Sequence, residues 1–135
     1  DITQDYSFWW KENIRWGDQD AMGHVNNVQF ARYIEASRIP FFLKLIGGDK
    51  NQGPSFILAR LEVNYLREMY FPGQVEVGTN VSDIGTSSVS LAHAIFNKKI
   101  CTGTGKSIVV HIDTESRKPT PIPDYLQKLL AKQSH

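Results

Sequence analysis

The chain has 135 residues, of which 41% are hydrophobic and 21% are charged. This length and composition are typical of one compact globular domain, so residues 1–135 are expected to form a single domain. The 15 basic and 14 acidic side chains leave a net charge of +1. Such a balance excludes a bulk attraction to nucleic acid or to an anionic membrane, and any anionic ligand must be held by local groups.

Cys101 is the only cysteine, which excludes an internal disulfide framework and a multi-cysteine metal site. No apolar run approaches the roughly 20 residues of a membrane-spanning helix. The start of the chain is polar and carries no basic flank, so it does not resemble a signal peptide. We expect a cytoplasmic protein without a membrane span. A mitochondrial or other organellar location stays open, because the sequence has no initiator Met and a targeting segment could have been removed.

The first predicted elements are a strand over residues 8–15 and a loop over residues 17–23, where Gly and Asp favour turns. A helix is expected to begin at Asn26 or Asn27, because an Asn side chain can accept an unpaired N–H group at a helix start. Gly47-Gly48 is expected to end that helix.

The predicted helix is apolar on several sides, which predicts that it is largely buried. Pro40 lies inside it and predicts a kink or a division into two parts. One face repeats at spacings of three and four residues: Phe30, Ile34, Ser37, Phe41 and Leu45.

Four long strands are predicted after the helix, because β-branched and aromatic residues alternate with polar ones between turn signals. They cover residues 55–69, 74–84, 87–96 and 99–113. Short connections predict that consecutive strands are antiparallel neighbours. Three prolines at 119, 121 and 123 then lead to a short helix that Asp124 is expected to cap.

This order of elements predicts an α+β fold, in which one antiparallel sheet of about five strands wraps around one long helix. The two edges of such a sheet are unpaired in a monomer. We therefore expect that the chain forms an oligomer or that an edge is covered.

The segment from Arg15 to Phe30 concentrates the polar chemistry of the chain, with two carboxylates, a His and two Asn before an apolar helix. The N–H groups at a helix start can polarise a carbonyl and stabilise an oxyanion. A nearby carboxylate can attack that carbonyl or activate a water. The residues alone leave a second interpretation open, since Asp, Gly and Asn also occur before helices simply as caps and turns.

The motif Asp18-x-Asp20-x-x-Gly23-His24-Val25-Asn26-Asn27, followed by an aromatic-rich helix, resembles the signature of the 4-hydroxybenzoyl-CoA thioesterase-like hot-dog family. Residues 61–65 (LEVNY), residues 73–77 (GQVEV) and the last strand with Asp113 resemble the same family, so the similarity covers nearly the whole chain. The resemblance implies a hot-dog fold and hydrolysis of an acyl thioester with no cofactor and no metal. It also implies a homodimer or homotetramer with active sites at the subunit interfaces.

The resemblance places the catalytic carboxylate at Asp20, as nucleophile or as general base. His24 is expected to join the catalytic set. In the similar acyl-ACP thioesterases, a His at this place acts with an Asn two residues earlier, where this chain has Met22. Asp18 is expected to organise the loop.

The substrate-binding residues implied by the resemblance lie around the helix start, where backbone N–H groups receive the thioester oxygen. They are Gly23, Asn26, Asn27 and Val28. An acyl-CoA is the favoured substrate, with an acyl carrier protein thioester as the alternative. The basic pairs at residues 98–99 and 117–118 are candidates for contacts with the CoA phosphates.

Two other functions stay open at this level. A hot-dog enoyl-CoA hydratase also uses an Asp and a His close together, but its Asn-Pro step is missing here and the Asp18-to-His24 spacing is one residue longer. A non-catalytic hot-dog subunit that binds acyl ligands is the third interpretation, because function depends on the site rather than on the fold.

Overall fold

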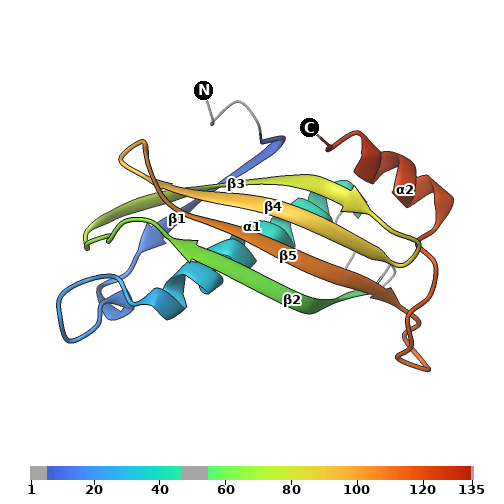
Figure 1. Cartoon of the computed structure of the whole chain (residues 1–135), viewed down its shortest axis with the longest axis horizontal. Helices are drawn as coiled ribbons and strands as arrows, with labels where there is room; N and C mark the ends of the chain where they lie inside the picture. Colours follow the sequence, from blue (N-terminus) through green and yellow to red (C-terminus); the bar gives the residue numbers. More distant parts are fainter. Residues whose placement is uncertain (1–5, 47–54, 135) are drawn as a thin grey trace.

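The structure is a computed structural model that describes residues 6–46 and 55–134. Five antiparallel strands form one sheet, and a long helix lies along one face of it (Figure 1). This arrangement confirms the predicted α+β fold. The elements, in chain order, are β1 (Phe8–Ile14), the short 3-10 helix η2 (Trp16–Asp18), α1 (Asn27–Ile46), β2 (Ser55–Tyr65), β3 (Gly73–Ile84), β4 (Ser88–Asn97), β5 (Ile100–Ile112) and α2 (Asp124–Ala131).

The strand order across the sheet is β1-β3-β4-β5-β2. The prediction that consecutive strands are neighbours is correct for β3, β4 and β5 and wrong for β2. β2 pairs with β5, from Ser55 opposite Ile112 to Tyr65 opposite Gly103, at the edge of the sheet away from β3. Residues 66–72 therefore cross one end of the sheet to reach β3, and β1 occupies the place beside β3 that the short connection had suggested for β2.

Helix α1 begins where the capping argument predicts. The Asn26 side chain accepts the N–H of Val28 at 3.1 Å, which is an N-cap bond. The helix is assigned without a break through Pro40, so the predicted division into two parts is wrong. The predicted stop at Gly47-Gly48 lies outside the described residues.

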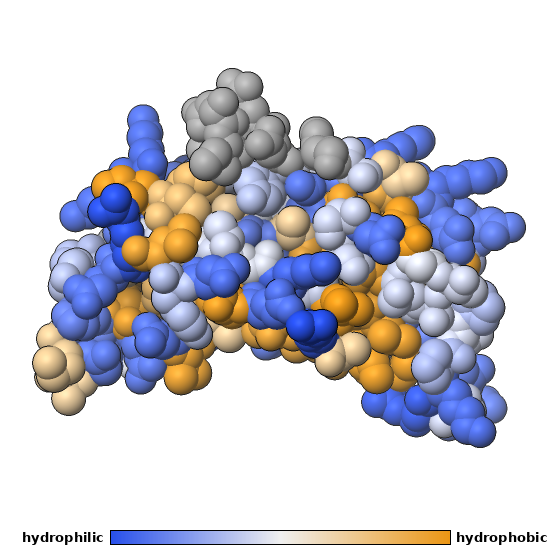
Figure 2. Space-filling model, viewed as in Figure 1, coloured by the Kyte–Doolittle hydropathy of each residue, from blue (hydrophilic) through white to orange (hydrophobic). Residues whose placement is uncertain are grey.

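The helix is buried along one face rather than on several sides. Four of the five residues of the predicted stripe are buried, and Leu45 is partly buried. On other sides, Val28 is 69% and Ile39 is 48% exposed. Apolar side chains gather along the lower margin of the molecule in Figure 2, where Figure 1 shows β2 and α1. Ile57 and Leu58 of the edge strand β2 are also exposed.

The interior contains two apolar clusters with a row of polar side chains between them. The row crosses from α1 to β5: Ser37 Oγ to Thr79 Oγ1 at 2.9 Å, Thr79 Oγ1 to His93 Nδ1 at 3.0 Å, and His93 Nε2 to Ser107 Oγ at 2.5 Å. All four side chains are buried. On α1, Ser37 separates Ile34 of the first cluster from Phe41 of the second. Each polar atom of the row has a partner, so the row can cross the core without an unsatisfied group.

The C-terminal helix α2 is amphipathic and closes the second cluster with buried Leu126 and Leu130. The prediction that Asp124 caps this helix is wrong. The N-cap position belongs to Pro123, and Asp124 lies in the first turn, where its charge still suits the helix dipole. Across residues 6–46 and 55–134, no helix combines the length and apolar character needed to span a membrane.

The buried His93 predicts a specific acid sensitivity. Burial, and to a smaller extent the charge of Arg38, lowers the pKa of His93 from its ordinary value of 6.5 to about 3. Below pH 6.5 the unfolded chain therefore binds a proton that the folded protein does not. The free energy of unfolding should fall by up to ~1.4 kcal/mol per pH unit as the pH is lowered from about 6 to about 4. Urea denaturation at a series of pH values measures this slope.

The matched control for this experiment is His93→Gln, which keeps a polar side chain but cannot titrate. This variant should be less stable than the wild type at pH 7 and should show a flatter slope between pH 6 and 4. The same slope in both proteins would contradict the assignment to His93.

Candidate active site

The polar loop between β1 and α1 is built around the enclosed side chain of Asp18, which is 0% exposed. Its carboxylate accepts four hydrogen bonds: from the Arg15 backbone N–H at 2.8 Å, Arg15 Nε at 3.0 Å, Arg32 Nη2 at 2.8 Å and the Tyr33 hydroxyl at 2.9 Å. These donors come from the end of β1 and from two adjacent residues of α1. One carboxylate thus ties both ends of the loop together.

The charge of Asp18 is stabilised in this enclosed position. Burial alone would raise the pKa of Asp18, but the hydrogen bonds from Arg15 and Tyr33 and the charge of Arg32 outweigh it, so the pKa is lowered. Burial and the adjacent Asp18 carboxylate raise the pKa of Tyr33, which keeps its hydroxyl protonated as a donor. Asp18 therefore has the loop-organising position expected from the sequence.

The backbone of the same loop decides which N–H groups at the helix start are available. The Asn26 N–H donates to the Asp18 carbonyl at 2.8 Å, and the Val28 N–H donates to the Asn26 side chain. Within the described part of the chain, the Asn27 N–H donates to no partner. Of the three N–H groups predicted to bind substrate, Asn27 alone thus has a donor ready for a ligand.

Asp20 is half-buried and is held by the turn that follows it. Its Oδ1 accepts the N–H of Met22 at 2.9 Å and the N–H of His24 at 3.2 Å. The turn closes through Gly23, whose φ of +84° is a conformation that favours glycine. In the part of the chain that the structure describes, Oδ2 makes no hydrogen bond. One carboxylate oxygen thus positions the side chain, and the other is available for chemistry.

The ring of His24 does not bond to Asp20; its side-chain contacts come from residues 66–72. His24 Nε2 lies 3.4 Å from Glu68 Oε2, and the His24 ring meets the Tyr70 ring edge-on at 5.6 Å. The Tyr70 hydroxyl donates to the same Glu68 oxygen at 2.8 Å. Glu68 is 59% exposed at its side chain, so this group orients the imidazole rather than contributing much stability.

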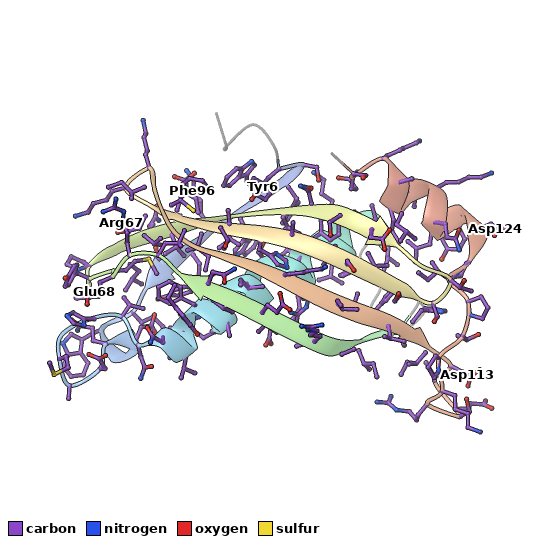
Figure 3. The ribbon with its side chains drawn as sticks, in the orientation of Figure 1. Tyr6, Arg67, Glu68, Phe96, Asp113 and Asp124 are labelled. Carbon is purple, nitrogen blue, oxygen red and sulfur yellow. The ribbon has the colours of Figure 1, made fainter. Side chains whose placement is uncertain are left out.

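A pocket of about 280 Å³ opens where the loop, the start of α1 and residues 65–68 meet. Figure 3 shows Arg67 and Glu68 at this end of the sheet, beside the loop, while Asp113 and Asp124 lie at the other end. The residues that line the pocket are Asp20, His24, Val25, Asn27, Phe30, Tyr65, Leu66, Arg67 and Glu68.

Three of the residues predicted for the site line this pocket: Asp20, His24 and Asn27. Gly23, Asn26 and Val28 do not line it. Gly23 shapes the turn, Asn26 caps the helix, and the N–H of Val28 is already bonded.

The contribution of residues 65–68 to the pocket could not be seen in the predicted strand over residues 55–69, because β2 ends at Tyr65. Met69 is buried, and its carbonyl accepts the N–H of Val25 at 2.8 Å, which brings this connection against the loop. The polar run Arg67-Glu68 directly before Met69 is the signal that could have marked a strand end. No three His, Cys, Asp or Glu side chains among residues 6–46 and 55–134 are grouped to hold a metal ion.

Residues 14–130 match the Thioesterase-like superfamily, and the chain belongs to this family. The uncharacterised protein YsmA of Bacillus subtilis (strain 168) is 30% identical over 115 residues, covering 84% of this chain and 78% of that protein. A predicted thioesterase from Bacillus stearothermophilus has a similar structure, with a TM-score of 0.87, 27% identity and coverage of 95% of this chain and 96% of that one.

A thioesterase from Thermus thermophilus, solved with coenzyme A and Zn, superimposes with a TM-score of 0.84 at 28% identity, covering 93% of this chain and 98% of that one. These comparisons confirm the hot-dog fold and the thioesterase resemblance, and they support thioester hydrolysis as the general class of activity.

The enclosed Asp18 carboxylate should be a large local contributor to stability. Asp18→Asn keeps the shape but removes the charge that faces Arg15 and Arg32, and it replaces one carboxylate oxygen with an amide nitrogen that cannot accept a hydrogen bond. We expect a loss of roughly 2 to 3 kcal/mol in the free energy of unfolding, because hydrogen bonds to a charged group are the strong ones. Chemical denaturation at pH 7 measures it.

Asp113→Asn is the matched control, since Asp113 is exposed and accepts two backbone N–H groups in a turn at the far end of the sheet. It should change stability far less than Asp18→Asn. Equal effects of the two substitutions would contradict the central role of Asp18.

Proposed function

We propose that this protein hydrolyses an acyl-CoA to the free acid and CoA, with Asp20 as the catalytic carboxylate and the Asn27 N–H as the donor to the thioester oxygen. The observation that carries the proposal is that both groups line one pocket and that each has an atom without a hydrogen bond to residues 6–46 and 55–134: Oδ2 of Asp20 and the N–H of Asn27. A carbonyl placed between them would be polarised from one side and attacked from the other.

Two routes use the same atoms. In the first route, Asp20 removes a proton from water while the water oxygen attacks the carbonyl carbon. The carbonyl oxygen becomes negative and accepts a hydrogen bond from the Asn27 N–H. The C–S bond then breaks, and the thiolate takes the proton from Asp20. In the second, the Asp20 carboxylate itself attacks, the thiolate leaves, and water hydrolyses the resulting anhydride. The residues around Asp20 are compatible with both.

The role proposed for His24 is to contact the substrate beside the reacting carbonyl. Its backbone N–H helps to orient Asp20, and its ring is held at the pocket by Glu68 and Tyr70. His24 is thus proposed to act without the Asn partner that the acyl-ACP thioesterases have. In this chain Met22 stands at the position of that Asn, and its side chain is exposed.

Coenzyme A is the proposed thiol part of the substrate. Support comes from the relative solved with coenzyme A and from Arg67, which brings a cation to the rim of the pocket. A cation there suits the phosphates of a nucleotide, whereas the net charge of +1 gives no general attraction to anions.

The proposed assembly is a homodimer or homotetramer. Among the described residues, the edge strand β2 has no strand on its outer side, and exposed apolar residues lie on it and on α1, among them Ile57, Leu58 and Ile39. An unpaired edge with apolar side chains is a surface that a second copy can cover. Such an interface would lie next to the pocket wall formed by Tyr65 and Leu66.

The role of Asp20 is tested by following thiol release from acyl-CoAs with Asp20→Asn and Asp20→Ala. Both variants should lose at least about 100-fold in kcat, which corresponds to roughly 3 kcal/mol of transition-state stabilisation. Asp113→Asn, which removes a carboxylate at the far end of the sheet, should retain wild-type rates. Undiminished release in the Asp20 variants would refute the assignment.

The role of the Asn27 N–H is tested by Asn27→Pro, which removes the donor and keeps the helix. Asn27 is the first residue of α1, a position where proline is well tolerated. Loss of one oxyanion donor should lower kcat by about 100- to 1,000-fold. Asn27→Ala is the control, because it removes the side chain and keeps the N–H, so it should retain most of the rate. Equal rates in the two variants would exclude the N–H as the donor.

A further inference from the structure

The residues that line the pocket are of two chemical kinds. Its polar lining consists of Asp20, His24, Asn27, Arg67 and Glu68, and its mainly apolar lining consists of Val25, Phe30, Tyr65 and Leu66. The reacting thioester is proposed to lie beside Asp20 and Asn27, so the apolar side chains are the surface available to the acyl group. Phe30 lies one helical turn after Asn27, on the same side of α1, so an acyl group that starts at Asn27 meets the Phe30 ring next.

Phe30 separates the pocket from the apolar core. Its side chain is 2% exposed and belongs to the first apolar cluster, yet it also lines the pocket. Its ring meets the Tyr65 ring edge-on at 5.1 Å. On the other side lies Gly103 of β5, where an added Cβ would come within 3.0 and 3.2 Å of two Phe30 ring atoms. The ring thus lies between the pocket and β5, and the absence of a side chain at Gly103 gives it room.

We propose that Phe30 is the specificity-determining residue of this pocket and that its ring limits the substrate to short acyl groups. The proposal rests on the proposed thioesterase function and adds the class of acyl group. The buried Phe30 ring lies between the pocket and Gly103 and blocks an extension of the pocket toward β5, which agrees with a short chain. Truncating Phe30 would extend the pocket toward Gly103 into an apolar space, which binds apolar groups readily.

The structure offers two substitutions with opposite expected effects. Phe30→Ala removes the wall, so longer chains should enter. Gly103→Ala presses a methyl group against the Phe30 ring from behind, so the ring must shift toward the pocket and the longest accepted chain should shorten. The φ angle of Gly103 lies outside the left-handed region, so alanine can adopt it; the added Cβ would also lie 3.2 Å from the Asn64 carbonyl oxygen, so Gly103→Ala is expected to cost some stability as well.

Phe41→Ala is the matched control for Phe30→Ala. Phe41 lies on the same helix, is also 2% exposed, and belongs to the second cluster, away from this pocket. Both truncations remove the same buried ring and should reduce stability to a similar extent. They should differ only in their effect on the choice of acyl chain. Phe30→Leu, which removes less volume, provides the same test if Phe30→Ala does not fold.

The experiment measures kcat/KM for acetyl-, butyryl-, hexanoyl-, octanoyl- and dodecanoyl-CoA by thiol release. Wild type should favour the short chains. In Phe30→Ala, the ratio of octanoyl- to butyryl-CoA should rise by on the order of 10-fold or more, the range that one or two methylene groups in an apolar pocket can supply. The ratio should fall in Gly103→Ala and stay unchanged in Phe41→Ala.

An active wild type whose chain-length profile is the same in Phe30→Ala and Phe41→Ala would overturn the role of Phe30 and leave the proposed hydrolysis intact. A preference of the wild type for dodecanoyl-CoA would overturn the limit to short chains. Absence of thiol release by the wild type from every acyl-CoA would instead overturn the proposed function itself.

Discussion

The site depends on one enclosed charge. The Asp18 carboxylate, fully buried and bonded to Arg15, Arg32 and Tyr33, joins the end of β1 to the second turn of α1. A buried carboxylate without these donors would cost several kcal/mol, so the loop is restricted to the conformation that supplies them. The backbone carbonyl of Asp18 in turn accepts a hydrogen bond from the Asn26 N–H and so fixes where helix α1 begins. These bonds of Asp18 therefore determine the positions of Asp20 and of the Asn27 N–H, which donates to no partner among the described residues.

The same constraint distinguishes the two similar acids of the motif and supports a structural role for Asp18 and the proposed catalytic role for Asp20. Asp18 accepts four hydrogen bonds and is not exposed, whereas Asp20 is half-buried, uses one oxygen for the turn and lines the pocket. A reactive carboxylate needs an accessible lone pair, and only Asp20 of the two has one. The sheet contributes the second half of the pocket through residues 65–68, which carry Tyr65 and Glu68 to the helix start.

Local features of the fold could be predicted from the sequence, because they depend on neighbouring residues. The Asn26 cap, the buried stripe of α1 and the extents of β3 and β5 follow from capping and periodicity. The pairing of β2 with β5 could not be predicted, since a short connection is compatible both with a neighbouring strand and with a crossing at the sheet end. The contacts of His24 with Glu68 and Tyr70 depend on that crossing, so they were missed as well. The motif indicated Asp20, and the hydrogen bonds of the helix start distinguish Asn27 from Asn26 and Val28.

The pocket that Asp20 and Asn27 line is proposed to cleave a thioester. The most direct measurement is to incubate the purified wild-type protein with the acyl-CoA series and to quantify free thiol and free carboxylic acid together. We expect both products to appear in equal amounts, without added metal or cofactor. A hydroxyacyl-CoA formed from an unsaturated substrate without thiol release would point to hydration instead, and binding of acyl-CoA with neither product would point to a carrier. Either result would contradict thioester hydrolysis at this pocket.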